Sequence, residues 1–213
     1  MDRRKFITGS VAALATAALA KVAAALPPDE KTKANTMKIV VLTGSPRKNG
    51  NSSYLAGEFI KGAQEAGHEV FRFDSAFQKV EGCMACNRCG MDGPCVLKDD
   101  FELVRQRLIE ADMVVFATPM YYFGCSAQLK KVIDRFYAIN GKIKGTHKKA
   151  AFLMTYADTA QEEAEPMLRH YNTLVDYLGW ENVGTVVAPG VWTAGSVRNT
   201  RYPQEAYLLG KNL

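Results

Sequence analysis

The sequence lacks a strong charge imbalance and a long apolar run. Lys and Arg outnumber Asp and Glu by only 27 to 22 in 213 residues, a formal net charge of +5. So small an excess excludes the basic surface on which nucleic-acid recognition depends. A charge-free run of about 20 apolar residues, as a membrane-spanning helix requires, is also missing. The three His residues are scattered along the chain, so no residue is assigned a catalytic acid–base role.

The remaining composition is typical of one globular domain. With 47% hydrophobic and 23% charged residues, the chain can form a core, which excludes disorder, a collagenous fibre and a small disulfide scaffold. Its five cysteines are unevenly placed, because four lie between positions 83 and 95 while Cys125 stands alone. We interpret Cys125 as a packing residue.

Residues 1–26 have the pattern of an export signal. An Arg pair precedes an apolar, Ala-rich run over 7–20, and small residues suitable for cleavage follow. The paired arginines resemble the twin-arginine type of bacterial signal, which implies export of the folded protein to the periplasm or another extracytoplasmic space. The membrane would then serve only for export. An uncleaved anchor over 7–26 is the alternative, because Lys21 is the only charge within it.

A polar linker, 27–36, is predicted ahead of a domain over 37–213, in which short β-branched runs alternate with longer amphipathic ones. Strands are expected over 38–43, 69–73, 113–117, 150–154 and 183–188, and helices over 53–66, 101–111, 126–137, 161–178 and 203–209. This alternation predicts an α/β fold with a doubly wound parallel sheet, because parallel neighbours need a crossover that a helix supplies. Ligands bind beyond the carboxyl ends of such strands, so we expect the chemistry in the loops after the first four.

Residues 44–53 lead from the first strand into the first helix with the sequence Gly-Ser-Pro-Arg-Lys-Asn-Gly-Asn-Ser-Ser. Backbone N–H groups and hydroxyls at a helix N-terminus form an anion site, and Arg47 adds a charged donor. The loop matches neither the dinucleotide fingerprint nor the nucleoside triphosphate loop. It therefore predicts a site for a phosphate monoester. A plain helix cap formed by Asn51, Ser52 and Ser53 is the alternative.

Residues 118–130, after the third strand, contain consecutive aromatic side chains. Aromatic residues in a loop favour stacking on a flat ligand, and Pro119 and Gly124 would keep the backbone close to the edge of its ring. A hydrophobic plug between helices is the alternative. Residues 155–158, after the fourth strand, stand where a third contact is expected, but their pattern is weak.

These two segments resemble the flavin-binding loops of the flavodoxin-like NAD(P)H-dependent FMN reductase superfamily. The resemblance implies the strand order 2-1-3-4-5, FMN as cofactor, NAD(P)H as a possible electron donor, and a homodimer or homotetramer. It implies phosphate ligands at Ser45, Arg47, Asn51, Ser52 and Ser53. It implies contacts with the flavin ring at Pro119, Met120, Tyr121, Tyr122, Phe123 and Gly124.

A cysteine-rich loop, residues 82–96, follows the second strand and carries a C-x2-C-x2-C-x5-C motif formed by Cys83, Cys86, Cys89 and Cys95. Three thiolates spaced by two residues can surround one corner of a metal–sulfur cube, and a turn at 93–94 can bring in the fourth. Together with the fold, this spacing resembles the iron–sulfur flavoproteins, which implies one 4Fe-4S cluster. A zinc site, two disulfides, and a motif that binds no metal remain as alternatives.

These features predict an FMN-dependent oxidoreductase in which the cluster relays single electrons. The resemblance implies NAD(P)H or a reduced ferredoxin as donor, and a redox partner protein or a small molecule such as a quinone as acceptor. One alternative is an exported electron carrier with no substrate of its own. Another is a protein, with or without flavin, whose cysteines bind zinc or form disulfides.

Overall fold

The computed structural model of the chain describes residues 36–213. The predicted signal peptide, 1–26, and nearly all of the predicted linker, 27–36, lie outside the described residues. Within the described part, no helix combines the length and the apolar character needed to cross a membrane.

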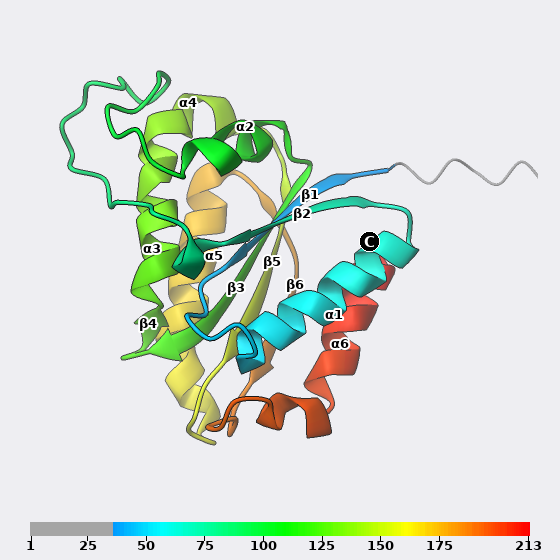
Figure 1. Cartoon of the computed structure of the whole chain (residues 1–213). Helices are drawn as coiled ribbons and strands as arrows, with labels where there is room; N and C mark the ends of the chain where they lie inside the picture. The colour runs from blue at the N-terminus through cyan, green and yellow to red at the C-terminus, as the bar shows by residue number, and fades with distance from the viewer. Residues whose placement is uncertain (1–35) are drawn as a thin grey trace, which may run out of the picture. The chain divides into compact units, whose positions relative to one another are not determined.

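A parallel sheet of five strands forms the centre of the fold (Figure 1). Its order, β2-β1-β3-β5-β6, confirms the predicted order 2-1-3-4-5. The five strands are β1 (Lys38–Thr43), β2 (Glu69–Asp74), β3 (Met113–Tyr121), β5 (Lys149–Thr155) and β6 (Glu181–Ala188). A short strand that was not predicted, β4 (Gly124–Cys125), pairs antiparallel with the end of β3. The central strands are buried on both sides, which explains their continuous aliphatic runs.

Helices cover both faces of this sheet (Figure 1). One face carries α1 (Asn51–Glu65) and α6 (Tyr202–Lys211), and the other carries α2 (Glu102–Glu110), α3 (Ala127–Asp134) and α5 (Glu165–Leu178). At Gly62 and Gly210 the first pair approaches so closely that a Cβ atom would overlap the backbone of the facing helix, at Tyr207 and Phe59 respectively. Glycine is therefore required where α1 crosses α6.

The third strand and the segment after it differ from the sequence prediction. β3 continues to Tyr121 instead of ending at residue 117, because Met120 and Tyr121 pair with β4 in a hairpin. The helix predicted over 126–137 ends at Asp134 and is followed by a 3-10 segment, η2 (Arg135–Ile139), and a short α4 (Asn140–Ile143).

The start of two other helices also shifts. The helix predicted from residue 53 begins at Asn51, so the Asn-Ser-Ser sequence forms its first turn. The helix predicted from residue 161 begins as a 3-10 turn over Gln161–Ala164, and α5 starts at Glu165 with proline in its first positions, where proline has no helical N–H bond to lose.

The cysteine-rich loop lies between a 3-10 turn, η1 (Ser75–Phe77), and α2. Residues 82–96 form turns and irregular backbone without a strand or an α-helix. In Figure 1 this loop extends from the end of the molecule where α2 and α4 lie, away from β4. Its conformation therefore depends on side-chain contacts rather than on a backbone ladder.

Candidate functional site

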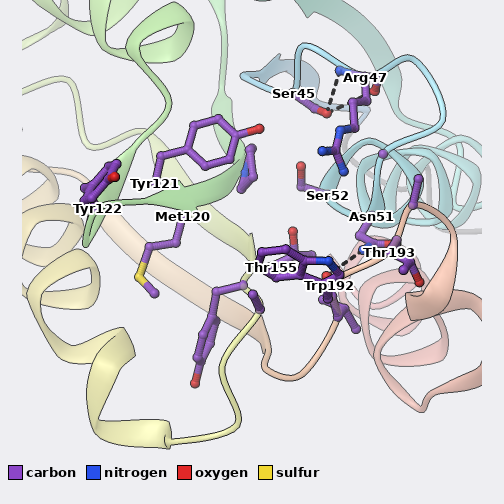
Figure 2. A pocket seen from close by; sticks show the side chains of 16 residues that line it. Ser45, Arg47, Asn51, Ser52, Met120, Tyr121, Tyr122, Thr155, Trp192 and Thr193 are labelled. Atoms are coloured by element: carbon purple, nitrogen blue, oxygen red, sulfur yellow. Dashed lines mark hydrogen bonds between the residues drawn. The ribbon is translucent and has the colours of Figure 1, made fainter.

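A cleft of about 710 Å³ opens at the carboxyl ends of β1, β3, β5 and β6. Figure 2 shows its two walls, with Arg47 reaching toward Ser52 on one side and Met120 and Tyr121 on the other. Its lining consists of Ser45, Arg47, Gly50, Asn51, Ser52, Pro119, Met120, Tyr121, Tyr122, Thr155, Tyr156, Ala157, Val191, Trp192, Thr193 and Ala194. This is the edge at which ligands bind in doubly wound sheets.

The loop over residues 44–50 folds into a tight turn at the N-terminus of α1. The Ser45 hydroxyl donates to the Arg47 carbonyl at 3.0 Å, and the Gly50 amide donates to the same carbonyl at 2.9 Å. A Cβ at Gly50 would lie 2.5 Å from the Ser45 Oγ, so a side chain would not fit here. The first turn of α1, which lies fully within the described residues, has no acidic side chain and no capping side-chain bond. Its positive dipole end is therefore open to an anion.

Ser52 provides the test of whether this loop fits a phosphate. Its side chain is 1% exposed, and its Oγ has no hydrogen-bond partner among the described residues. A buried hydroxyl left unpaired costs about 1–3 kcal/mol, whereas a phosphate oxygen in the cleft would satisfy it. Because Arg47 supplies the charge in the same lining, the donor set matches the phosphate of FMN.

The structure gives Asn51 and Ser53 other contacts. The Asn51 Nδ2 donates to the carbonyls of Val191 and Thr193, both at 2.9 Å, and its Oδ1 accepts from the Val197 amide at 3.3 Å. Asn51 therefore fixes the loop after β6 against α1, which Figure 2 shows at the edge of the cleft.

The hydroxyl of Ser53 faces β2 instead. It accepts a hydrogen bond of 2.6 Å from Arg72 Nη2, and Ser53 is absent from the lining of the cleft. Arg72 also donates from Nε to Asp74 at 2.9 Å, and the Thr43 hydroxyl donates to the same carboxylate oxygen at 2.6 Å. This network joins the N-terminus of α1 to β1 and β2, on the side away from the cleft lining.

The aromatic segment is a hairpin rather than a loop. Pro119, Met120 and Tyr121 belong to β3, and they line the cleft together with Tyr122. Phe123 and Gly124 are not among the lining residues. Tyr122 and Phe123 form the tip with positive φ angles of 47° and 61°, and the Tyr122 side chain is fully exposed at 102%.

Two further walls of the cleft were underestimated or missed. Thr155–Ala157, at the end of β5, had a weak sequence signal, and Val191–Ala194, after β6, was not predicted. Val191 donates its amide to the Tyr156 carbonyl at 2.9 Å, which joins the two loops. Trp192 is 77% exposed although it lines the cleft. The Pro-Gly pair at 189–190, which ends β6, is the signal that marked this loop.

The four clustered cysteines line a second, smaller pocket. Cys83 and Cys86 are exposed, Cys89 is half-buried and Cys95 is buried. All five cysteines are free thiols, so the two disulfides considered above are not formed. Within residues 36–213, no group of three or more His, Cys, Asp or Glu side chains is placed to hold a metal ion. The pocket thus collects the four thiols without arranging them as a finished site.

Cys125 differs from these four thiols. It is half-buried in β4, away from the cysteine-rich loop, and burial raises the pKa of its thiol above the usual value. Because the thiolate is the reactive form, this environment suits a packing residue.

Comparison with known proteins agrees with this geometry. The family model of NADPH-dependent FMN reductase matches residues 37–196. The chain is 32% identical over 157 residues to an iron-sulfur flavoprotein of Archaeoglobus fulgidus, covering 73% of this chain and 70% of that protein. It is 35% identical over 99 residues to an iron-sulfur flavoprotein of Methanocaldococcus jannaschii, covering 46% of this chain and 51% of that protein. The match thus spans about half the length of the second relative.

Among solved structures, the NAD(P)H:quinone oxidoreductase from Methanothermobacter marburgensis has a similar fold, with a TM-score of 0.66 at 22% sequence identity. The alignment covers 83% of this chain and 96% of that one. At this identity the likeness supports the fold alone, whereas the family match covers most of the described residues. The chain therefore belongs to the NADPH-dependent FMN reductase family of flavin oxidoreductases.

Proposed function

We propose that the cleft binds FMN with its phosphate at Ser45, Arg47 and Ser52. The end of β3, where Met120 and Tyr121 offer apolar and aromatic surface, and the loop after β5 would hold the isoalloxazine ring. When bound, FMN supplies transfer of a hydride or of single electrons, and the protein binds and orients it. The observation that carries this proposal is the buried hydroxyl of Ser52, which has no hydrogen-bond partner in the described part of the chain and shares the lining of the cleft with the Arg47 guanidinium at a helix N-terminus.

A titration of the apoprotein with FMN tests this assignment. Arg47→Ala should weaken FMN binding by about tenfold or more, because a charge-assisted hydrogen bond contributes about 1.5–3 kcal/mol. Lys48→Ala is the matched control, since Lys48 lies outside the lining and stands 5.5 Å over the Phe77 ring. Equal loss in both variants would contradict the phosphate assignment.

The reaction we propose is reduction of a small acceptor such as a quinone at the expense of NADH or NADPH. Its support is the family match and the room at the open mouth of the cleft, where Tyr122 and Trp192 are exposed. The FMN-loaded protein should oxidise NADPH or NADH only when a quinone is present. Tight FMN binding without any turnover would instead favour an electron carrier, whose exposed aromatic rim docks a partner protein.

We further propose that Cys83, Cys86, Cys89 and Cys95 hold one 4Fe-4S cluster. Four thiolates are the donor set that such a cluster requires, and all four residues line one pocket. Binding would draw the exposed sulfurs of Cys83 and Cys86 inward. Metal binding and local folding commonly occur together, so we expect the cluster to complete the geometry of this loop.

Cys86→Ser tests the cluster. After anaerobic reconstitution with iron and sulfide, the variant should lose the cluster absorbance and retain FMN. Cys125→Ser is the control and should retain both. Iron content unchanged in the Cys86 variant would overturn the assignment, and tetrahedral binding of zinc in place of iron would support the zinc alternative.

Two proposals concern the cellular setting. The paired arginines and the Ala-rich run within residues 1–26 support export by a twin-arginine route. The family resemblance supports self-association as a dimer or tetramer. Replacing Arg3 and Arg4 by Lys should hold the protein in the cytoplasm, and sedimentation of the FMN-loaded protein should show more than one chain per particle.

A further inference from the structure

Arg135 is the largest fully buried side chain in the described part of the molecule, and the proposed function does not use it. It begins η2, immediately after α3, and its side chain is 0% exposed. A buried charge is tolerated only where it is paired and hydrogen-bonded. Its partners therefore indicate what it is placed to do.

The guanidinium joins the two ends of the cysteine-rich loop. Its Nη1 donates to the Glu81 carbonyl at 3.1 Å and to Asp99 Oδ2 at 2.6 Å, and its Nη2 donates to the Leu97 carbonyl at 3.3 Å. Glu81 immediately precedes the loop, and Leu97 and Asp99 follow it. One side chain thus closes the base of residues 82–96.

Asp99 completes this closure from the other side. Its Oδ2 accepts from the Glu81 amide at 3.0 Å, and its Oδ1 accepts from the Phe101 amide at 3.2 Å. Burial raises the pKa of Asp99, but the hydrogen bonds from Arg135 and the Glu81 amide outweigh it and hold that pKa below its usual value. The carboxylate is therefore charged and pairs with Arg135.

One donor of Arg135 is unused. Its Nε is buried and has no hydrogen-bond partner among the described residues. Of the described residues that line the pocket around the four cysteines, Arg135 is also the only one with a charged side chain. A 4Fe-4S core of charge +2 with four thiolates has a net charge of −2, so a cation with a free N–H at this pocket matches the group in charge and in hydrogen bonding.

We infer that Arg135 is a positioning residue for the cysteine site, an inference that rests on the proposed cluster. It holds the ends of the cysteine-rich loop together, and it presents a buried positive charge and a free N–H to the sulfur ligands. Reduction makes the cluster more negative, so a nearby cation stabilises the reduced form and raises its midpoint potential. Asp99 limits this effect because its negative charge partly cancels that of Arg135.

The experiment uses the FMN-loaded protein, reconstituted anaerobically with iron and inorganic sulfide. Arg135→Gln should lower the midpoint potential of the cluster and reduce iron retention against a chelator by about 10- to 100-fold. Asp99→Asn should raise the potential, because Arg135 then loses its counter-charge. The double variant should return the potential toward that of the wild type. Arg135→Lys keeps the positive charge but loses the two Nη groups that hold the ends of the loop. It should leave the midpoint potential of the cluster unchanged and retain less iron than the wild type.

A matched control comes from an exposed ion pair on α2, in which Arg105 Nε lies 2.9 Å from Glu102 Oε2. Arg105→Gln and Glu102→Gln carry the same charge changes outside the pocket and should leave potential and iron retention unchanged. FMN affinity, measured in every variant, reports that the fold is intact. If Arg135→Gln also loses FMN, the midpoint potentials of Arg135→Lys and Asp99→Asn are compared instead. An unchanged potential in Arg135→Lys and a raised potential in Asp99→Asn support the inference, and equal potentials contradict it.

The outcomes separate the two proposals. If the wild type binds FMN but takes up no iron, the cluster is overturned, and the role of Arg135 with it. If the wild type binds the cluster while Arg135→Gln and Asp99→Asn shift its potential in the same direction, or not at all, only the role of Arg135 is overturned. Opposite shifts support it, because a purely structural clamp would make both variants behave alike.

Discussion

The cleft and the cysteine-rich loop differ in how much of their geometry the polypeptide fixes by itself. The cleft stands on the ends of buried strands, where the Gly44 amide donates to the Ala117 carbonyl at 2.8 Å and the Ser126 hydroxyl donates to the Gly44 carbonyl at 2.7 Å. A Cβ at Gly44 would overlap the Ser126 hydroxyl, so this junction has no freedom. A site built on such a junction is preformed.

The cysteine-rich loop has little of this support. Three of its non-glycine residues, Ala85, Asn87 and Met91, have positive φ angles of 54°, 53° and 64°. Such backbone costs about 1 kcal/mol or more per residue and persists only where other contacts compensate for it. Compensation comes from the base of the loop, from the Tyr137 hydroxyl, which donates to Asn87 Oδ1 at 3.0 Å, and from the Gly141 amide, which donates to the Met91 carbonyl at 2.9 Å. In our proposal a bound cluster adds to these contacts. One sheet thus carries a cleft fixed by buried strand ends and a cysteine-rich loop that depends on contacts outside the sheet.

The largest effect should come from breaking the base of the cysteine-rich loop. Asp99→Ala leaves the guanidinium of Arg135 buried without its counter-charge, and the free energy of unfolding should fall by about 3–5 kcal/mol. Urea denaturation monitored by circular dichroism measures this loss. Asp100→Ala is the control, because the Asp100 carboxylate accepts a hydrogen bond from the Lys79 amide at 2.7 Å on the surface and has no other hydrogen bond among the described residues. Its loss should cost about 1 kcal/mol. Equal losses would mean that the buried pair does not stabilise the loop.

Ser52→Ala tests whether the cleft is preformed. The variant should bind FMN about 10- to 100-fold more weakly, because a hydrogen bond to a charged phosphate contributes about 1.5–3 kcal/mol. The apoprotein should be no less stable than the wild-type apoprotein, since the buried hydroxyl has no hydrogen-bond partner within residues 36–213 to lose. Isothermal titration with FMN and thermal unfolding of the apoprotein give the two values. A destabilised apoprotein with normal FMN affinity would place Ser52 in the scaffold instead.

Asn51→Ala tests whether the side chain of Asn51 fixes the loop after β6, which forms one wall of the cleft. Loss of the bonds to Val191, Thr193 and Val197 should loosen the loop after β6 and lower the free energy of unfolding by about 1–3 kcal/mol. FMN affinity should fall less than in Ser52→Ala. Hydrogen exchange of residues 191–197 should increase, while that of the cysteine-rich loop should not change. A loss of FMN affinity as large as that of Ser52→Ala, without faster exchange, would show that Asn51 binds the phosphate, as the sequence predicts.

Much of the fold followed from the sequence because backbone periodicity is a local property. Alternating aliphatic and amphipathic runs predicted all five long strands and their order by resemblance, and the structure confirms that order. The hairpin at Met120–Cys125 was not predicted, since its turn needs left-handed backbone at Tyr122 and Phe123, which are residues that rarely adopt it.

The site was predictable where one segment supplies several donors, and less so where distant segments meet. Ser45, Arg47, Asn51 and Ser52 were predicted from one loop, and all four line the cleft. Asn51 has the residue type of a phosphate ligand, but its amide is used by a loop about 140 positions away. A partner that distant leaves no local trace in the sequence. Trp192 was missed although the Pro-Gly pair at 189–190 marks the loop that carries it.

Acidification should lower the stability of the sheet on which both the cleft and the cysteine-rich loop are built. Its effect on the free energy of unfolding should be the smallest of those predicted, and it should not distinguish the two regions. His68 lies at the amino end of β2, where its Nδ1 accepts from the Met37 amide at 3.3 Å and its Nε2 is buried without a partner among the described residues. Burial, followed by the positive charge of Lys149, lowers the pKa of His68 below 6.5. The folded state thus favours neutral His68, and its contribution is complete above about pH 6.5 and is lost as the pH falls through the folded-state pKa.

The free energy of unfolding should therefore decrease below about pH 6.5, with a slope from this group of at most about 1.4 kcal/mol per pH unit. His68→Gln should reduce that slope, because glutamine can accept from the Met37 amide without taking up a proton. His170→Gln is the comparison, since burial lowers the pKa of His170 as well and part of the slope belongs to it. Urea unfolding between pH 5 and 8 measures the slope. If His68→Gln leaves it unchanged, the amino end of the sheet does not sense pH, and the acid sensitivity arises elsewhere, as at His170 on α5.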